Sequence, residues 1–197
     1  MIMIQQLLQD KNLILASGSP RRKMFLEELG LSFEIRTKDI DEHYPPDLKE
    51  IEISDYLAKL KAESFAGELR TNDILITADT IVWFKGRALG KPENFEDACL
   101  ILSELSGQKH SVLSSVAITT TENQVLINEE TSVWFKKLTH QEIEYYVKEY
   151  EPYDKAGAYG IQEWIGFIAI EKIVGSHYNV MGFPVQKFYQ AMIKMNS

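Results

Sequence analysis

Apolar residues along the chain recur with two spacings, one typical of strands and one typical of helices. The strongest strand pattern covers residues 73 to 84, and a shorter apolar run covers residues 13 to 16 and ends at Ser17. Strands and helices alternate over the whole length, which predicts an α/β or α+β fold with a mixed sheet. The other predicted strands are 31–36, 109–120, 124–136 and 167–174, and the predicted helices are 20–29, 54–69, 94–105, 139–150 and 184–195.

Polar residues that favour helix starts stand before four of these helices. Ser19, Ser54, Asn94 and Thr139 are expected as the first-turn caps, because their side-chain oxygens can accept from free backbone N–H groups. We find no internal repeat, linker or low-complexity stretch, so we expect one domain over residues 1–197.

The stretch from 13 to 22 predicts a strand, a tight loop and a helix start. Ser17, Gly18 and Ser19 form the loop, and Pro20 suits the first helical position. Arg21 and Arg22 stand in the first turn, where the helix dipole disfavours cations. Free amides, hydroxyls and guanidinium groups together indicate a phosphate site. The alternative is an ordinary turn with solvated arginines.

Asp79 lies within the strongest strand pattern, where a carboxylate is costly to bury. We therefore expect Asp79 at a strand end or a bulge that opens onto a cleft. Four other polar residues could contribute to the same ligand site, namely Glu42, Lys61, Lys91 and Gln162. Mg²⁺ and Mn²⁺ prefer oxygen ligands such as carboxylates. Cationic side chains neutralise phosphate charge, and a side-chain amide can pair with the edge of a nucleobase. Together they predict a nucleoside triphosphate bound with a divalent metal.

Composition limits the classes of protein that fit. The 197 residues are 45% hydrophobic and 25% charged, as in an ordinary soluble protein. The net charge of −8 argues against nucleic-acid and anionic-membrane partners, and the N-terminal stretch does not resemble a targeting signal, so we expect a cytoplasmic protein. A single cysteine, Cys99, excludes an internal disulfide, and the four histidines show no metal-ligand spacing.

Two familiar catalytic motifs are absent from the sequence. Residues 86 to 92 differ from a Walker A loop, because the spacing is one residue short and Pro92 replaces the metal-binding Ser or Thr. No Gly-x-Ser-x-Gly elbow occurs, which argues against a serine hydrolase.

Five short motifs in register give the chain a specific resemblance. They are Ala-Ser-Gly-Ser-Pro-Arg-Arg at 16–22, Ala-Asp-Thr-Ile-Val at 78–82, Gly-Lys-Pro at 90–92, Leu-Ser-Gly-Gln at 105–108 and Asp-Lys-Ala-Gly-Ala-Tyr-Gly-Ile-Gln at 154–162. In this order they resemble the Maf family of nucleoside triphosphate pyrophosphatases, from about Leu13 to Ile193. The last motif resembles the branch that acts on dTTP and UTP, including modified uridine nucleotides.

The resemblance implies a fold and an activity. The fold is an elongated mixed sheet flanked by helices, with two lobes and a deep cleft, similar to the inosine triphosphate pyrophosphatases. The activity is hydrolysis at the α-phosphorus to a monophosphate and pyrophosphate, in sanitation of the nucleotide pool. The resemblance also suggests a homodimer. A nucleotide-binding regulator of cell division with little turnover stays open as an alternative, motivated by the family's older description as septum-formation inhibitors.

The resemblance also implies roles for individual residues. Asp79 matches the proposed proton acceptor, and with Glu42 it would hold Mg²⁺ or Mn²⁺. The positions linked to substrate choice are Arg21, Thr80 and Gln162. The residues expected to meet phosphate are Ser17, Ser19, Arg22, Lys61 and Lys91.

Overall fold

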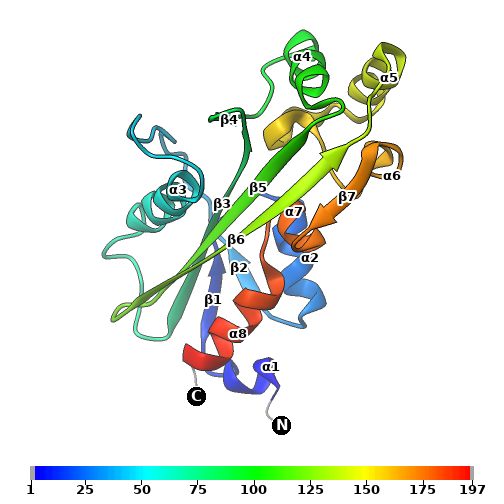
Figure 1. The fold of residues 1–197 in the computed structure, drawn as a ribbon. Coiled ribbons are helices and arrows are strands. Elements are labelled where there is room, and N and C mark those ends of the chain that lie inside the picture. Colours follow the sequence, from blue (N-terminus) through cyan, green and yellow to red (C-terminus); the bar gives the residue numbers. More distant parts are fainter. Residues whose placement is uncertain (1–2, 196–197) are drawn as a thin grey trace. The chain divides into compact units, whose positions relative to one another are not determined.

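The computed structural model describes residues 3–195, which form a seven-stranded mixed sheet with helices against it (Figure 1). The strands follow the order β2-β1-β3-β5-β6-β7, and β4 pairs with β3. Their bounds are β1 Asn12–Leu15, β2 Phe33–Ile35, β3 Asp73–Phe84, β4 Arg87–Leu89, β5 Lys109–Thr119, β6 Gln124–Phe135 and β7 Ile170–Val174. The α-helices are α1 Ile4–Leu7, α2 Pro20–Glu28, α3 Ile51–Glu63, α4 Phe95–Leu105, α5 His140–Tyr150, α6 Trp164–Ala169, α7 His177–Val180 and α8 Val185–Met195.

The mixed α/β fold that the sequence predicted is confirmed. Strand β1 pairs in parallel with both β2 and β3, whereas β4 and β7 pair antiparallel with β3 and β6. Among residues 3–195, no helix is both long enough and apolar enough to cross a membrane.

The chain divides into two compact units, which we describe separately. The first takes in residues up to Asp79, Ser114–Glu129 and residues from Gly182 on. The second takes in Thr80–Leu113 and Glu130–Met181.

In the first unit, helices cover both faces of the parallel strands. Alternation along β1 and β3 sends Ile14 and Leu75 to one face, where they pack with Ala58, Ala62 and Phe65 from and after α3. Figure 1 shows α3 on one side of these strands and α2 and α8 on the other. On that other side Phe183 stacks on Phe25 of α2, with ring centroids 6.2 Å apart.

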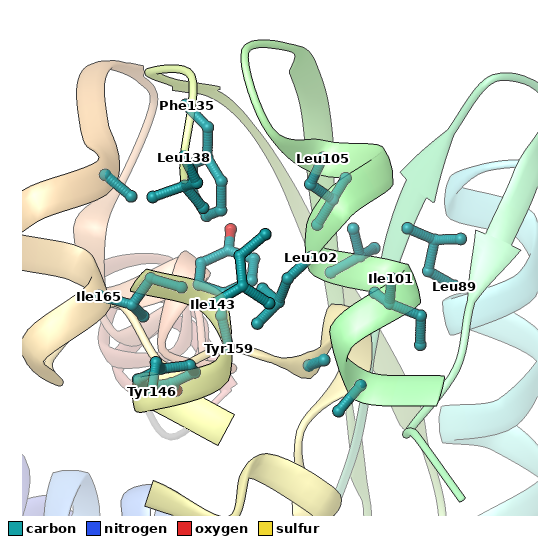
Figure 2. Packing of buried hydrophobic residues seen from close by; sticks show 14 of the residues in the cluster. Leu89, Ile101, Leu102, Leu105, Phe135, Leu138, Ile143, Tyr146, Tyr159 and Ile165 are labelled. Atoms are coloured by element: carbon teal, nitrogen blue, oxygen red, sulfur yellow. The ribbon is translucent and has the colours of Figure 1, made fainter. Parts of the chain in front are cut away.

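In the second unit, the core lies between α4, α5 and the strands. Figure 2 shows Ile143 and Tyr146 of α5 in one cluster with Leu102 of α4, Tyr159 and Ile165. Tyr146 has none of its surface exposed and Tyr159 only 6%, so the segment after α5 is held mainly by buried apolar contacts.

Two of the predicted N-cap residues do cap their helices through a side-chain hydrogen bond. The side chain of Asn94 accepts from the N–H of Asp97, and Thr139 with Glu142 forms a reciprocal capping box. Ser19 stands at the N-cap position of α2, but its hydroxyl makes no capping hydrogen bond there.

The predicted start of the helix at Ser54 is wrong. Helix α3 begins three residues earlier and ends at Glu63 rather than near Leu69. The Ser54 hydroxyl donates to the carbonyl of Ile51 and contacts the Ser115 hydroxyl at 2.8 Å, fully buried. Its role is therefore in packing between α3 and β5.

The predicted strand at 167–174 is a short helix followed by a strand. Gly166 lies so close to the carbonyl of Ile161 that a Cβ atom would stand 1.8 Å from its oxygen. Only glycine fits at this close approach, and β7 begins only at Ile170, after α6. The elements α1, β4 and α7 also escaped the sequence analysis, because each has only three or four residues.

His110 is a buried histidine in the second unit, and it makes stability depend on pH. Its Nε2 lies 2.7 Å from the Tyr159 hydroxyl, and burial lowers its pKa to about 4. The unfolded chain therefore binds more protons between pH 6.5 and 4, so the free energy of unfolding falls as the pH drops through this window. The full effect is about 3 kcal/mol.

We predict that His110→Gln flattens this part of the pH dependence. Urea unfolding at pH 7.5 and 4.5 measures it, and His140→Gln is the control because the His140 side chain is 76% exposed. Identical pH dependence of the wild type and His110→Gln would contradict the assignment.

Candidate active site

Asp79 lies inside β3 with 7% of its surface exposed, so the expected strand end is wrong. Alternation places it on the same face as Leu75 and Thr77. The Thr77 hydroxyl donates to the Ala58 carbonyl of α3 at 2.7 Å, which shows that this face is turned toward α3. Pairing of β3 with β1 ends at Ile76, and pairing with β4 begins at Val82. Asp79 therefore falls between two stretches of pairing with these strands.

Lys61 of α3 compensates the charge of this buried carboxylate. Its Nζ lies 2.6 Å from Asp79 Oδ1 and 3.1 Å from Glu42 Oε1. Lys61 follows Ala58 by three residues and so shares the helix face that packs on the sheet. The exposed fraction of the side chains rises outward, from 9% for Asp79 through 16% for Lys61 to 46% for Glu42.

Glu42 and Asp79 form a donor set that suits a hard divalent cation shared with a ligand. The two carboxylates already converge on one positive charge, the Lys61 ammonium. No cluster of three or more His, Cys, Asp or Glu side chains arranged for a metal occurs within residues 3–195. Mg²⁺ commonly uses one or two carboxylates and completes its shell with phosphate oxygens and water, so these two residues fit such an ion.

The loop before α2 is held together by Ser17 and Arg22. The Ser17 oxygen accepts from the Ser19 N–H at 3.3 Å and from Arg22 Nη1 at 3.2 Å. Arg22 also donates to the carbonyls of Ala78, at 2.9 Å, and Gly182, at 3.1 Å. Arg22 thus joins the loop, the residue before Asp79 and the segment before α8.

Electrostatics around Arg22 reflect this position. Burial lowers the pKa of its guanidinium, and the neighbouring charge of Asp79 works in the opposite direction. The charge of Arg21 lowers the pKa further, which shows that the two arginines lie close together at the start of α2. Seven of the predicted site residues therefore belong to the first unit, where contacts join Lys61 to Glu42 and Asp79, and Ser17 to Ser19 and Arg22. The seven are Ser17, Ser19, Arg21, Arg22, Glu42, Lys61 and Asp79.

The second unit holds Thr80, Lys91 and Gln162. The loop of Lys91 is tied to the segment of Gln162 because the Gly157 N–H donates to the Gly90 carbonyl at 3.0 Å. Gly157 has a φ of +71°, and a Cβ atom there would lie 2.7 Å from Val82. The Oε1 atom of Gln162 is buried and has no hydrogen-bond partner among the described residues.

A polar network beside Gln162 was not assigned from the sequence. Glu163 pairs with Lys155 at 3.1 Å and accepts a short hydrogen bond from the Tyr146 hydroxyl. Lys155 stands inside the motif at 154–162, so the sequence did mark it for attention. Tyr146 follows an ordinary apolar helix pattern and carries no such mark. Only the folded chain brings these three residues together.

A comparison with protein families identifies the lineage of this chain. The description "Maf-like protein" matches residues 12–195, nearly the full length. The chain belongs to the Maf family. The resemblance noted in the sequence is thereby confirmed.

Curated members of the family are similar along the whole chain. A relative from Flavobacterium johnsoniae is 52% identical over 95% of this chain and 97% of its own length. Relatives from Flavobacterium psychrophilum and Bacteroides thetaiotaomicron are 49% and 48% identical, covering 95% and 93% of this chain and 96% and 95% of their own. Each of the three is named a dTTP/UTP pyrophosphatase.

Solved structures show a more distant likeness. The Staphylococcus aureus Ham1 protein is 14% identical, with a TM-score of 0.44 over 64% of this chain and 72% of its own. A nucleoside-triphosphatase, dITP/XTP pyrophosphatase, from Mycobacterium abscessus is 16% identical, with a TM-score of 0.37 over 63% of this chain and 72% of its own.

We predict that Gly157→Ala destabilises the protein more than Gly86→Ala. Both glycines have positive φ, +71° and +81°, so both variants lose about 1 to 2 kcal/mol from the left-handed conformation. Only at Gly157 does the new Cβ meet Val82, which adds about 1 to 3 kcal/mol of overpacking. Urea unfolding of the two variants measures the difference, and equal losses would show that the Val82 contact relaxes freely.

Proposed function

We propose that this protein hydrolyses dTTP and UTP to the monophosphate and pyrophosphate, and so removes unwanted pyrimidine nucleotides, modified ones included. The proposal is supported by the names of relatives with 47 to 52% identity over nearly the full chain. The observation that carries it is the buried Asp79 carboxylate, paired with Lys61 beside Glu42. The relatives' names are those of enzymes, which does not favour the division-regulator alternative.

Phosphate binding falls to the cations and the loop before α2. Two donors already use the acceptor capacity of the Ser17 oxygen, so its own O–H is the group that can reach a phosphate. Ser19 and the first amides of α2 add donors at the positive end of the helix dipole. We assign Arg22, Lys61 and Lys91 to the negative charge of the triphosphate. Negative charge builds up on the pyrophosphate as it leaves, and these cations stabilise it.

Glu42 and Asp79 are the residues that would hold Mg²⁺ or Mn²⁺. Such an ion, when bound together with the triphosphate, supplies charge neutralisation on the phosphate oxygens. Lys61 contacts both carboxylates and balances part of their negative charge.

Asp79 is the group that we assign as general base. Its Oδ1, which Lys61 contacts at 2.6 Å, is the oxygen that we assign to the ion, and we assign Oδ2 to the attacking water. Asp79 orients this water toward the α-phosphorus and takes its proton as the new P–O bond forms. The bond from the α-phosphorus to the bridging oxygen breaks, and pyrophosphate leaves.

Gln162 is the group that we assign to the base. Uracil and thymine both carry an N3–H donor beside a carbonyl oxygen, whereas cytosine carries an acceptor at N3. The unpartnered Oε1 of Gln162 suits the N3–H, and its amide N–H suits the carbonyl. A buried group left unpaired by the wrong base rejects it, so dTTP and UTP should be preferred over CTP. Arg21 and Thr80 are the other positions that we propose for substrate choice.

The homodimer, the cytoplasmic location and the lack of nucleic-acid or membrane partners remain predictions. The net charge of −8 supports the last of these, because like charges oppose binding to anionic polymers and lipids.

The reaction predicts where the oxygen of water ends. Incubation with UTP and Mg²⁺ in ¹⁸O-labelled water should yield labelled UMP and unlabelled pyrophosphate, identified by mass spectrometry. A reaction mixture with a chelator in place of Mg²⁺ is the control and should yield neither product. Label in orthophosphate, accompanied by UDP, would contradict attack at the α-phosphorus.

We predict that Asp79→Asn lowers kcat for UTP by about 10² to 10⁴, the usual contribution of a general base. Asp73→Asn is a matched control at the first residue of β3, where the carboxylate accepts from the Arg70 N–H at 2.9 Å. That control should lose stability and keep its kcat. A kcat of Asp79→Asn within threefold of the wild type would remove Asp79 from the role of base.

A further inference from the structure

Gln162 and Glu163 lie against the same small residue. A Cβ atom at Gly160 would stand 3.0 Å from Gln162 Nε2 and 2.9 Å from Glu163 Oε2. An amide donor and a carboxylate acceptor therefore lie on the same side of the Gly160 backbone. Left to itself, a carboxylate attracts an adjacent N–H strongly, because charge-assisted hydrogen bonds are about twice as strong as neutral ones.

Each oxygen of Glu163 already accepts from one partner, which uses part of its acceptor capacity and weakens its attraction for a neighbouring amide. Lys155 Nζ lies 3.1 Å from Oε1, and the Tyr146 hydroxyl contacts Oε2. Lys155 is only 8% exposed, and a second pair, 2.6 Å to Asp154, holds its ammonium in place.

The direction of the Tyr146 hydrogen bond is fixed by a second contact. The Gly160 N–H donates to the Tyr146 oxygen at 3.0 Å, so the hydroxyl hydrogen is free to point to Glu163. Burial, followed by the bond to Glu163, raises the pKa of Tyr146, which keeps this hydrogen on the oxygen. Tyr146 thus supports the Gly160 backbone and occupies Glu163 Oε2 at once.

We propose that Tyr146 and Lys155 are positioning residues that keep Glu163 from capturing the Gln162 amide, and so leave that amide available to the pyrimidine. This inference rests on the proposed function, in which Gln162 reads the base. Neither residue touches the substrate. Their effect is on the affinity for the nucleotide and on the choice of base, because the Gln162 amide competes between Glu163 and the pyrimidine.

Tyr146→Phe is the first test, since it removes only the hydroxyl that occupies Glu163 Oε2. We expect KM for UTP to rise about tenfold, the value of one hydrogen bond, with kcat within about twofold of the wild type. The preference for UTP over CTP should fall by a similar factor. Tyr150→Phe is the matched control, on the same helix and stacked on Tyr146 at 5.1 Å, and should change neither quantity.

A double variant separates capture from simple damage. If Glu163 captures the amide in Tyr146→Phe, then adding Glu163→Leu removes the competing carboxylate. KM should then fall back to within about threefold of the wild-type value. A purely structural role for Tyr146 predicts the opposite, a KM that stays high or rises further, and that outcome would overturn the proposal, as would an unchanged KM in Tyr146→Phe.

Lys155→Met gives an independent route if Tyr146→Phe does not fold, as judged by its thermal unfolding. This variant removes the partner of Glu163 Oε1 and keeps the hydrogen bond between Tyr146 and Gly160. Its KM for UTP should also rise. Addition of Glu163→Leu should again bring KM back toward the wild-type value. Failure of the proposed function looks different, because the wild type would then release no pyrophosphate from UTP. A wild type that is active, with variants of unchanged KM, counts against the positioning role alone.

Discussion

A carboxylate buried within a sheet is the constraint around which the first unit is built. Asp79 stands between Ala78 and Thr80 in a mostly apolar strand, and its carboxylate is paired with the Lys61 ammonium of α3, with the Arg22 charge also close by. Removing Lys61 would leave that charge without its ion-pair partner, and breaking a buried ion pair in this way typically costs about 3 to 5 kcal/mol. The position of α3 on the sheet is therefore fixed by charge as well as by apolar packing. Glu42 is drawn to the same ammonium, and Arg22 holds the carbonyl of the residue next to Asp79.

Much of this arrangement could be predicted from the chain. The apolar run of β3 and the unusual carboxylate within it were both evident, and the cost of burial marked Asp79 as a residue whose charge needs compensation. The expected strand end was wrong because the compensating charge comes from Lys61, 18 residues earlier, and no local pattern reports such a partner. The start of α3 was misplaced for a related reason, since Ser54 suits a cap in sequence but meets Ser115 in the fold.

The second unit shows where prediction from local patterns ends. Its motif residues were found because they resemble a family, yet the network beside Gln162 joins residues 14 and 17 positions apart through one hydroxyl. Tyr146 is indistinguishable in sequence from the other apolar residues of α5. Within the helix at 164–169, Gly166 passes close to the Ile161 carbonyl, a contact that no local pattern reports. Strand and helix periodicities describe single elements, whereas these features arise between elements.

The discontinuity of the first unit has a consequence for biosynthesis. This unit is assembled from three separate stretches of the chain, and Arg22 bonds to the Gly182 carbonyl in the last of them. A ribosome must therefore translate the whole of the second unit before the first can close. The nascent chain carries the apolar faces of β1 and β3 without their α8 cover throughout that interval. Folding of the part that holds Asp79 is thus completed late, and during translation it is the part most open to chaperones and proteases.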